Sequence, residues 1–180
     1  DDGYKVPETV KLTRELIRET APVALVGLVG TGNVEALVKE GILADADIPV
    51  VGIRSGALSL VSPVVPQLFH TRASYAAEVD KIIRQLATTG IRRVAVLYQD
   101  DPLGLDGLAG AEKSLAHHKL ELAVKAPYEK NTVKVEAAVK AIAAARPQAV
   151  VMVSNTAASA EFVKLARTAG IDAQLLTLSI

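Results

Sequence analysis

The residues best suited to chemistry lie in one short loop, Gly30-Thr31-Gly32, between an apolar run and a helical pattern. Glycines let a backbone turn tightly and approach a ligand. Thr31 and Asn33 are good N-cap residues, and Glu35 stands where the first turn of a helix favours an acid. The loop would present free N–H groups and a hydroxyl at the carboxyl end of a strand. This arrangement can hold an anion such as a carboxylate or a phosphate.

A tight turn between a strand and a helix, with no ligand, is equally compatible with these residues. The loop is not a phosphate-binding P-loop, because no Gly-Lys-Ser/Thr follows it. It is also a poor dinucleotide fingerprint, because the glycines run G-x-x-G-x-G and Gly52-Ile53-Arg54 stands where an acid is expected.

The other titratable residues give weaker indications. A lone histidine such as His70 is more often structural than catalytic. His117 and His118 are neighbours on a helix, so they cannot chelate one metal as an i,i+4 pair would. The Asp100–Pro102 segment is typical of a turn. The sequence therefore assigns no catalytic residue, no metal ligand and no cofactor.

Composition excludes several classes. The 180 residues suffice for one domain or two small lobes, and 50% are hydrophobic. Lys+Arg and Asp+Glu both number 20 and aromatics are 3%, which argues against a nucleic-acid partner. There is no cysteine, so disulfides and thiolate metal sites are excluded. No apolar run is long enough to span a membrane, and the opening Asp1–Tyr4 is not a signal peptide, so an exported protein would already have lost its leader.

Periodicity predicts alternating strands and helices. Strands are expected over residues 22–27, 48–52, 92–99, 120–126, 148–153 and 174–178, and helices over 9–20, 33–44, 74–89, 105–118, 131–145 and 156–169. The first two strands are apolar enough to be buried on both faces. Residues 68–72 form a short strand or connector. The alternation predicts an α/β class with mainly parallel sheets and right-handed crossovers.

The pattern restarts near residues 70–74. We therefore expect two α/β lobes, residues 1–72 and 73–180, with a ligand held between them at a hinge. The irregular stretch 53–67, rich in Ser, Gly and Pro, is long for a loop in a compact domain and is expected to be functional or mobile.

Six segments carry a resemblance: Asp1–Tyr4, Val23–Asn33, Ile48–Val51, Phe69–Arg72, Val94–Asp101 and Ala166–Gly170. In this order and spacing they resemble the leucine/isoleucine/valine-type substrate-binding proteins of ABC transporters, which have the type I periplasmic-binding fold. The likeness covers essentially the whole chain. It implies two doubly wound lobes with mainly parallel sheets, incomplete at both ends, because members are about twice this long.

The resemblance also implies a ligand site. In the family, a hydroxyl after the glycine loop and a Ser/Ala/Thr segment after the next strand hold the ligand carboxylate, and the second lobe usually adds two aromatics. The matching positions, with an arginine that could pair with an anion, are Gly30, Thr31, Gly32, Arg54, Ser55, Gly56, Ala57, Tyr75, Leu103, Asn155 and Thr156. Leu103 and Asn155 or Thr156 replace the aromatics, so the ligand class stays open among amino acids, amides and small carboxylates.

The resemblance implies a non-enzymatic solute-binding protein that delivers its ligand to the membrane permease of an ABC transporter. Its location would be periplasmic, or extracellular with a lipid anchor. Two alternatives stay open. A ligand-sensing domain of a receptor or regulator shares this fold. A doubly wound enzyme is less favoured, because the sequence has no nucleophile elbow and no complete nucleotide motif.

Overall fold

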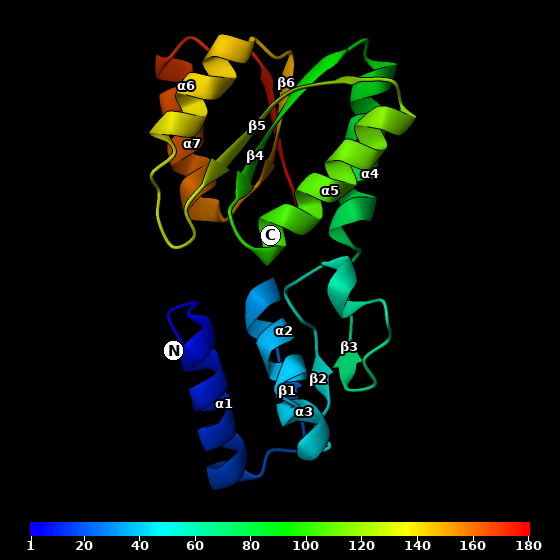
Figure 1. Ribbon diagram of the computed structural model, residues 1–180, viewed down its shortest axis with the longest axis vertical. Coiled ribbons are helices and arrows are strands. Elements are labelled where there is room, and N and C mark those ends of the chain that lie inside the picture. Colours follow the sequence, from blue (N-terminus) through cyan, green and yellow to red (C-terminus); the bar gives the residue numbers. More distant parts are fainter. The chain divides into compact units, whose positions relative to one another are not determined.

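The computed structural model describes residues 1–180, which form two compact units, Asp1–Ser74 and Tyr75–Ile180 (Figure 1). Every strand pair in both units is parallel. The predicted α/β class with parallel sheets is therefore confirmed. The division of a whole binding protein into lobes 1–72 and 73–180 stays a prediction.

The first unit is a three-stranded sheet, in the order β1-β2-β3, with three helices. Its helices are α1 (Val6–Thr20), α2 (Thr31–Lys39) and α3 (Ile42–Asp45), with a 3₁₀ turn η1 (Leu58–Leu60); its strands are β1 (Leu25–Val26), β2 (Val50–Val51) and β3 (Leu68–Phe69). The helix expected over 33–44 is two helices. Gly41, at φ +70°, takes a left-handed conformation that breaks the helix.

The sheet of the first unit has one buried and one exposed face. Leu25, Val50 and Leu68 point into the core with residues of α2 and α3. Their neighbours Val26, Val51 and Phe69 lie in register with one another on the other face and are 78%, 38% and 52% exposed. The prediction that the first two strands are buried on both faces is wrong, because helices of this unit pack on one face only.

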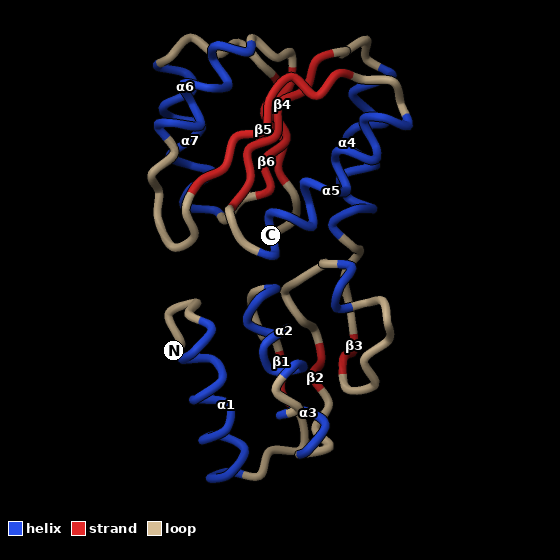
Figure 2. The backbone as a smooth tube through the Cα atoms, in the orientation of Figure 1, coloured by secondary structure: helices blue, strands red, loops and turns tan.

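The second unit is a four-stranded sheet in the order β5-β4-β6-β7. Its strands are β4 (Arg93–Gln99), β5 (Glu121–Tyr128), β6 (Ala149–Val153) and β7 (Gln174–Thr177); its helices are α4 (Tyr75–Thr88), α5 (Pro102–His117), α6 (Glu136–Ala145) and α7 (Thr156–Thr168). Helices α4 and α5 lie on one side of the sheet, and α6 and α7 on the other (Figure 2). Because both faces are covered, β6 is buried along its whole length.

Helix α5 begins at Pro102, three residues earlier than expected, because the Asp101 side chain accepts a hydrogen bond from the Gly104 N–H and caps it. Gly104 and Gly107 lie on the face of α5 that meets the sheet. A Cβ at residue 104 would overlap the carbonyl oxygen of Gln99, and one at residue 107 would overlap Val153. The two glycines therefore let α5 approach the sheet more closely than any side chain would permit.

Helices α4 and α5 are also joined by a buried hydroxyl. Ser114, 4% exposed, donates its O–H to the Asp80 carboxylate over 2.7 Å, and His118 Nε2 lies 3.4 Å from the same oxygen. The Ser114 hydrogen bond lowers the pKa of Asp80 below its ordinary value of 3.8; partial burial opposes this, and His118 adds to it.

We expect Ser114→Ala to make the free energy of unfolding less sensitive to acid. A carboxyl with a lowered folded-state pKa stabilises the fold at neutral pH, and that contribution is lost as the pH falls through the lowered pKa. The stability difference between the parent and S114A should therefore be largest near pH 7 and shrink below pH 4. Urea unfolding at pH 7, 5 and 3 measures it, and a difference that stays constant with pH would contradict the assignment.

No helix in residues 1–180 combines the length and the hydropathy needed to cross a membrane.

Candidate functional site

The glycine loop leads directly into α2. Gly30, at φ +99°, is the N-cap, and Thr31 is the first helical residue. The prediction that Thr31 or Asn33 supplies the N-cap is wrong, because the chain enters the helix through a conformation open mainly to glycine. The N-cap residue Gly30 has no side chain, so no N-cap hydrogen bond occupies the first N–H groups of α2.

The structure brings the Thr31 and Ser55 side chains together. Thr31 follows β1 and Ser55 follows β2, and a further bridge between Val29 and Arg54 extends the pairing of the two strands to these loops. The two hydroxyl oxygens lie 2.8 Å apart, and both residues are fully buried. Ser55 Oγ also accepts the Ala57 N–H over 3.3 Å. Because one hydrogen bond between two hydroxyls uses one proton, the pair keeps a second O–H that can be donated to an acceptor.

The other predicted residues of the first unit surround this pair. Gly30 and the Gly56–Ala57 segment are buried, Gly32 is half-buried in the first turn of α2, and the Arg54 side chain is exposed. An exposed guanidinium is free to rotate in water and is a weak determinant of geometry.

A series of hydrogen bonds that the sequence did not predict connects Asn33, in the first turn of α2, to Thr9 and Asp2. Asn33 is fully buried and donates its side-chain amide to Thr9 Oγ1 over 2.7 Å, and Thr9 donates to Asp2. The Asp2 carboxylate also accepts the Tyr4 N–H. Burial raises the pKa of Asp2, but these hydrogen bonds outweigh it and leave the pKa below its ordinary value. The sequence signal for these hydrogen bonds was an asparagine, Asn33, in the first turn of a helix.

In the second unit, Asn155 is the N-cap of α7, as its residue type predicts. Its Oδ1 accepts the Ala158 N–H over 3.0 Å. Thr156 follows it and is exposed. The side chains of Tyr75, at the start of α4, and Leu103, in the first turn of α5, are buried in the core. The structure therefore separates this group into an exposed hydroxyl, a helix cap and two core residues.

Asn155 belongs to a hydrogen-bonded network at the carboxyl edge of the sheet, which the sequence analysis missed. Gln99, the last residue of β4, is fully buried. Its Oε1 accepts hydrogen bonds from Tyr128 Oη and Asn155 Nδ2, each over 3.1 Å, and its Nε2 donates to Asp101 over 2.8 Å. The network thus joins the ends of β4, β5 and β6. The signal in the sequence was a glutamine at the end of the strand that contains the apolar run Val94–Leu97.

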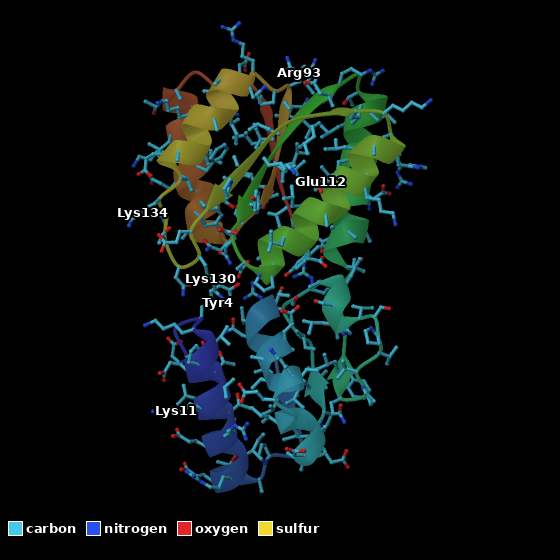
Figure 3. The ribbon with its side chains drawn as sticks, in the orientation of Figure 1. Tyr4, Lys11, Arg93, Glu112, Lys130 and Lys134 are labelled. Carbon is cyan, nitrogen blue, oxygen red and sulfur yellow. The ribbon has the colours of Figure 1, made fainter.

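An open hollow of about 400 Å³ lies beside this network, where β5 ends. Its lining comprises Asp100, Pro127, Tyr128, Glu129 and Lys130. Lys130 Nζ lies 3.5 Å from the Asp101 carboxylate and pairs with its charge. Figure 3 shows Lys130 at this edge of the unit and Arg93 at the opposite end of the strands. The hollow therefore occupies the edge at which open α/β sheets hold ligands.

Neither unit contains three His, Asp or Glu side chains placed to hold a metal ion. His70 Nε2 lies 3.0 Å from the Leu60 carbonyl oxygen, a structural contact. The His117 and His118 rings meet edge to face, with centroids 4.8 Å apart.

Residues 1–180 match the family described as periplasmic binding protein. No curated protein sequence matches the chain. The chain is similar to the crystal structure of a substrate-binding periplasmic protein from Ralstonia solanacearum, with 43% identity and a TM-score of 0.95, covering 99% of this chain and 50% of that one. It is also similar to a possible leucine/isoleucine/valine-binding protein from Rhodopirellula baltica SH 1, with 28% identity and a TM-score of 0.91, covering 98% and 49%.

A more distant likeness is to the solute-binding protein of an ABC transporter from R. palustris, crystallised in complex with benzoate. The identity is 21% and the TM-score 0.88, covering 98% of this chain and 49% of that one, and at this identity the likeness concerns the fold alone. The chain thus spans about half the length of these three proteins.

Proposed function

Because the chain belongs to the periplasmic binding protein family and has its type I fold, we propose that it serves as the solute-binding component of an ABC transporter. The solute is a small molecule that carries a carboxylate. The transporter partner is a membrane permease, and the location is the periplasm or the cell exterior. Members of this family bind substrates, and the proposed function involves no chemical step.

The proposal of a carboxylate-bearing ligand depends on one observation, the Thr31–Ser55 hydroxyl pair. The pair lies at the N-terminus of α2, and the hydrogen bond between its two hydroxyls uses only one of their two protons. The α2 dipole and the N–H groups of its first turn favour a negative group at the same point. Hydrogen bonds from hydroxyl and N–H donors to a carboxylate are charge-assisted and stronger than those to a neutral oxygen. These donors support a carboxylate as the group recognised by the first unit.

The solutes named for one similar structure agree with this class. Leucine, isoleucine and valine, suggested for the Rhodopirellula baltica protein, each carry a carboxylate. Within the class, we propose an amino-acid-like or simple carboxylate solute.

A carboxylate solute is expected to raise the unfolding temperature of the chain. A ligand at about 100 times its Kd adds roughly 2.7 kcal/mol to the free energy of unfolding. For a chain of this length, that corresponds to a rise of about 5–10 °C. Thermal unfolding is measured with a panel of aliphatic and aromatic amino acids and small carboxylates, and the matched controls are their amides and methyl esters.

A rise with carboxylates and none with the matched esters supports the proposal. If only amides or esters raised the unfolding temperature, the solute would belong to a class without a carboxylate. If neither this chain nor a longer protein that contains it responds to any solute, the transport proposal is wrong and the sensor or enzyme alternatives return.

A further inference from the structure

The Gln99 side chain bonds to groups at the ends of three different strands of the second unit. Gln99 ends β4, its Oε1 accepts from Tyr128 at the end of β5 and from Asn155 after β6, and its Nε2 donates to Asp101 at the start of α5. The amide orientation follows from the partners, because a carboxylate such as Asp101 can only accept.

The hydrogen bonds of the Gln99 side chain stay within the second unit. Both lone pairs of its oxygen are occupied by Tyr128 and Asn155, and its Nε2 donates to Asp101. Of its partners, Tyr128 and Asp101 are buried and Asn155 is half-buried. Tyr128 lines the hollow at the end of β5, and Asn155 immediately precedes the exposed Thr156.

Two of these partners depend on each other as well. The Tyr128 hydroxyl donates to Gln99 and accepts the backbone N–H of Asn155 over 3.1 Å. Asp101 uses its second oxygen to cap α5 through the Gly104 N–H. Removing the Gln99 amide would therefore release the Tyr128 hydroxyl, the start of α7 and the start of α5 together, because a buried network is stable only while its members are satisfied.

We infer that Gln99 is a positioning residue for solute binding by the second unit. It does not touch the solute, and it fixes Tyr128 and the N-terminal turn of α7 in the orientation that the solute meets. This inference rests on the proposed function, since it assigns the carboxyl edge of the second sheet to the solute site.

The test compares four proteins by calorimetric titration with L-leucine and with benzoate: the parent, Gln99→Met, Gln99→Glu and Ser114→Ala. Met keeps the shape of Gln99 without its hydrogen bonds. Glu keeps the two acceptor contacts but replaces the donor to Asp101 with a second buried carboxyl group. Ser114→Ala is the matched control, because it removes a different buried hydrogen bond of the same unit. We expect Q99M and Q99E each to weaken binding by roughly tenfold or more, and S114A not at all.

A second readout needs no solute. Hydrogen exchange of the Gly104 and Ala158 amides reports the two helix caps, and Q99M should accelerate both relative to S114A. If Q99M proves unable to fold, Q99E is compared with S114A instead, by the Kd and by the exchange rates of the Gly104 and Ala158 amides. Equal Kd values for S114A and the Gln99 variants would overturn the inference while leaving the proposed function intact. A parent protein that binds neither probe would overturn the solute assignment and this inference with it.

Discussion

Replacement of Gly104 with alanine is expected to lower the free energy of unfolding by about 3 kcal/mol. Residue 104 lies in the first turn of α5, and its Cβ would overlap the backbone carbonyl of Gln99 at the end of β4. A backbone obstacle cannot rotate away, so α5 would have to move off the sheet. That movement would also lengthen the hydrogen bond between the Gly104 N–H and the Asp101 carboxylate. Urea unfolding monitored by circular dichroism measures the change.

The same helix provides graded controls. A Cβ at residue 107 would overlap the Val153 side chain, and one at residue 110 would lie 3.0 Å from the Cα of Ala76 in α4. We expect G107A to cost less than G104A and to be partly rescued by Val153→Ala. G110A should be closest to neutral, because alanine gains about 0.5–1 kcal/mol over glycine within a helix. If all three variants were equally stable, the close approach of α5 to the sheet would be wrong.

The second large effect concerns the proposed solute site. Thr31→Val keeps the shape of the side chain and removes the hydroxyl bonded to Ser55. We expect it to raise the Kd of a carboxylate solute by about 10–100-fold, because a hydrogen bond to a charged group contributes roughly 1.5–3 kcal/mol. The loss in folding stability should be smaller, about 1 kcal/mol. Calorimetric titration with the solute that gives the largest thermal shift measures the Kd.

Thr20→Val is the matched control, since it makes the same substitution at an exposed helical position. The double variant T31V/S55A should bind no more weakly than the sum of the single effects predicts, because the two hydroxyls share one hydrogen bond and act as a unit. If the Kd of T31V equalled that of the parent, the hydroxyl pair would not take part in binding the solute.

The sequence predicted what depends on local pattern. Every strand and helix of the second unit except α6, which begins at Glu136 and not near residue 131, lies close to its expected range, because apolar periodicity and end residues such as Asn155 and Gly90 act within a few positions. The family resemblance implied that Thr31 and Ser55 serve one site, and their hydroxyl oxygens lie 2.8 Å apart. The Gln99 network was not predicted, since its hydrogen bonds join residues up to 56 positions apart and no local rule encodes them. The start of α2 was misjudged because Gly30 took the place of a side-chain cap.

The exposed row formed by Val26, Val51 and Phe69 also bears on how the chain behaves in solution. Molecules that display aliphatic and aromatic groups attract one another unless charge keeps them apart. This chain carries 20 basic and 20 acidic side chains and has no net charge at pH 7, so that repulsion is weakest near neutrality. Its solubility should therefore pass through a minimum near pH 7 and fall further with sulfate, which strengthens the burial of apolar surface.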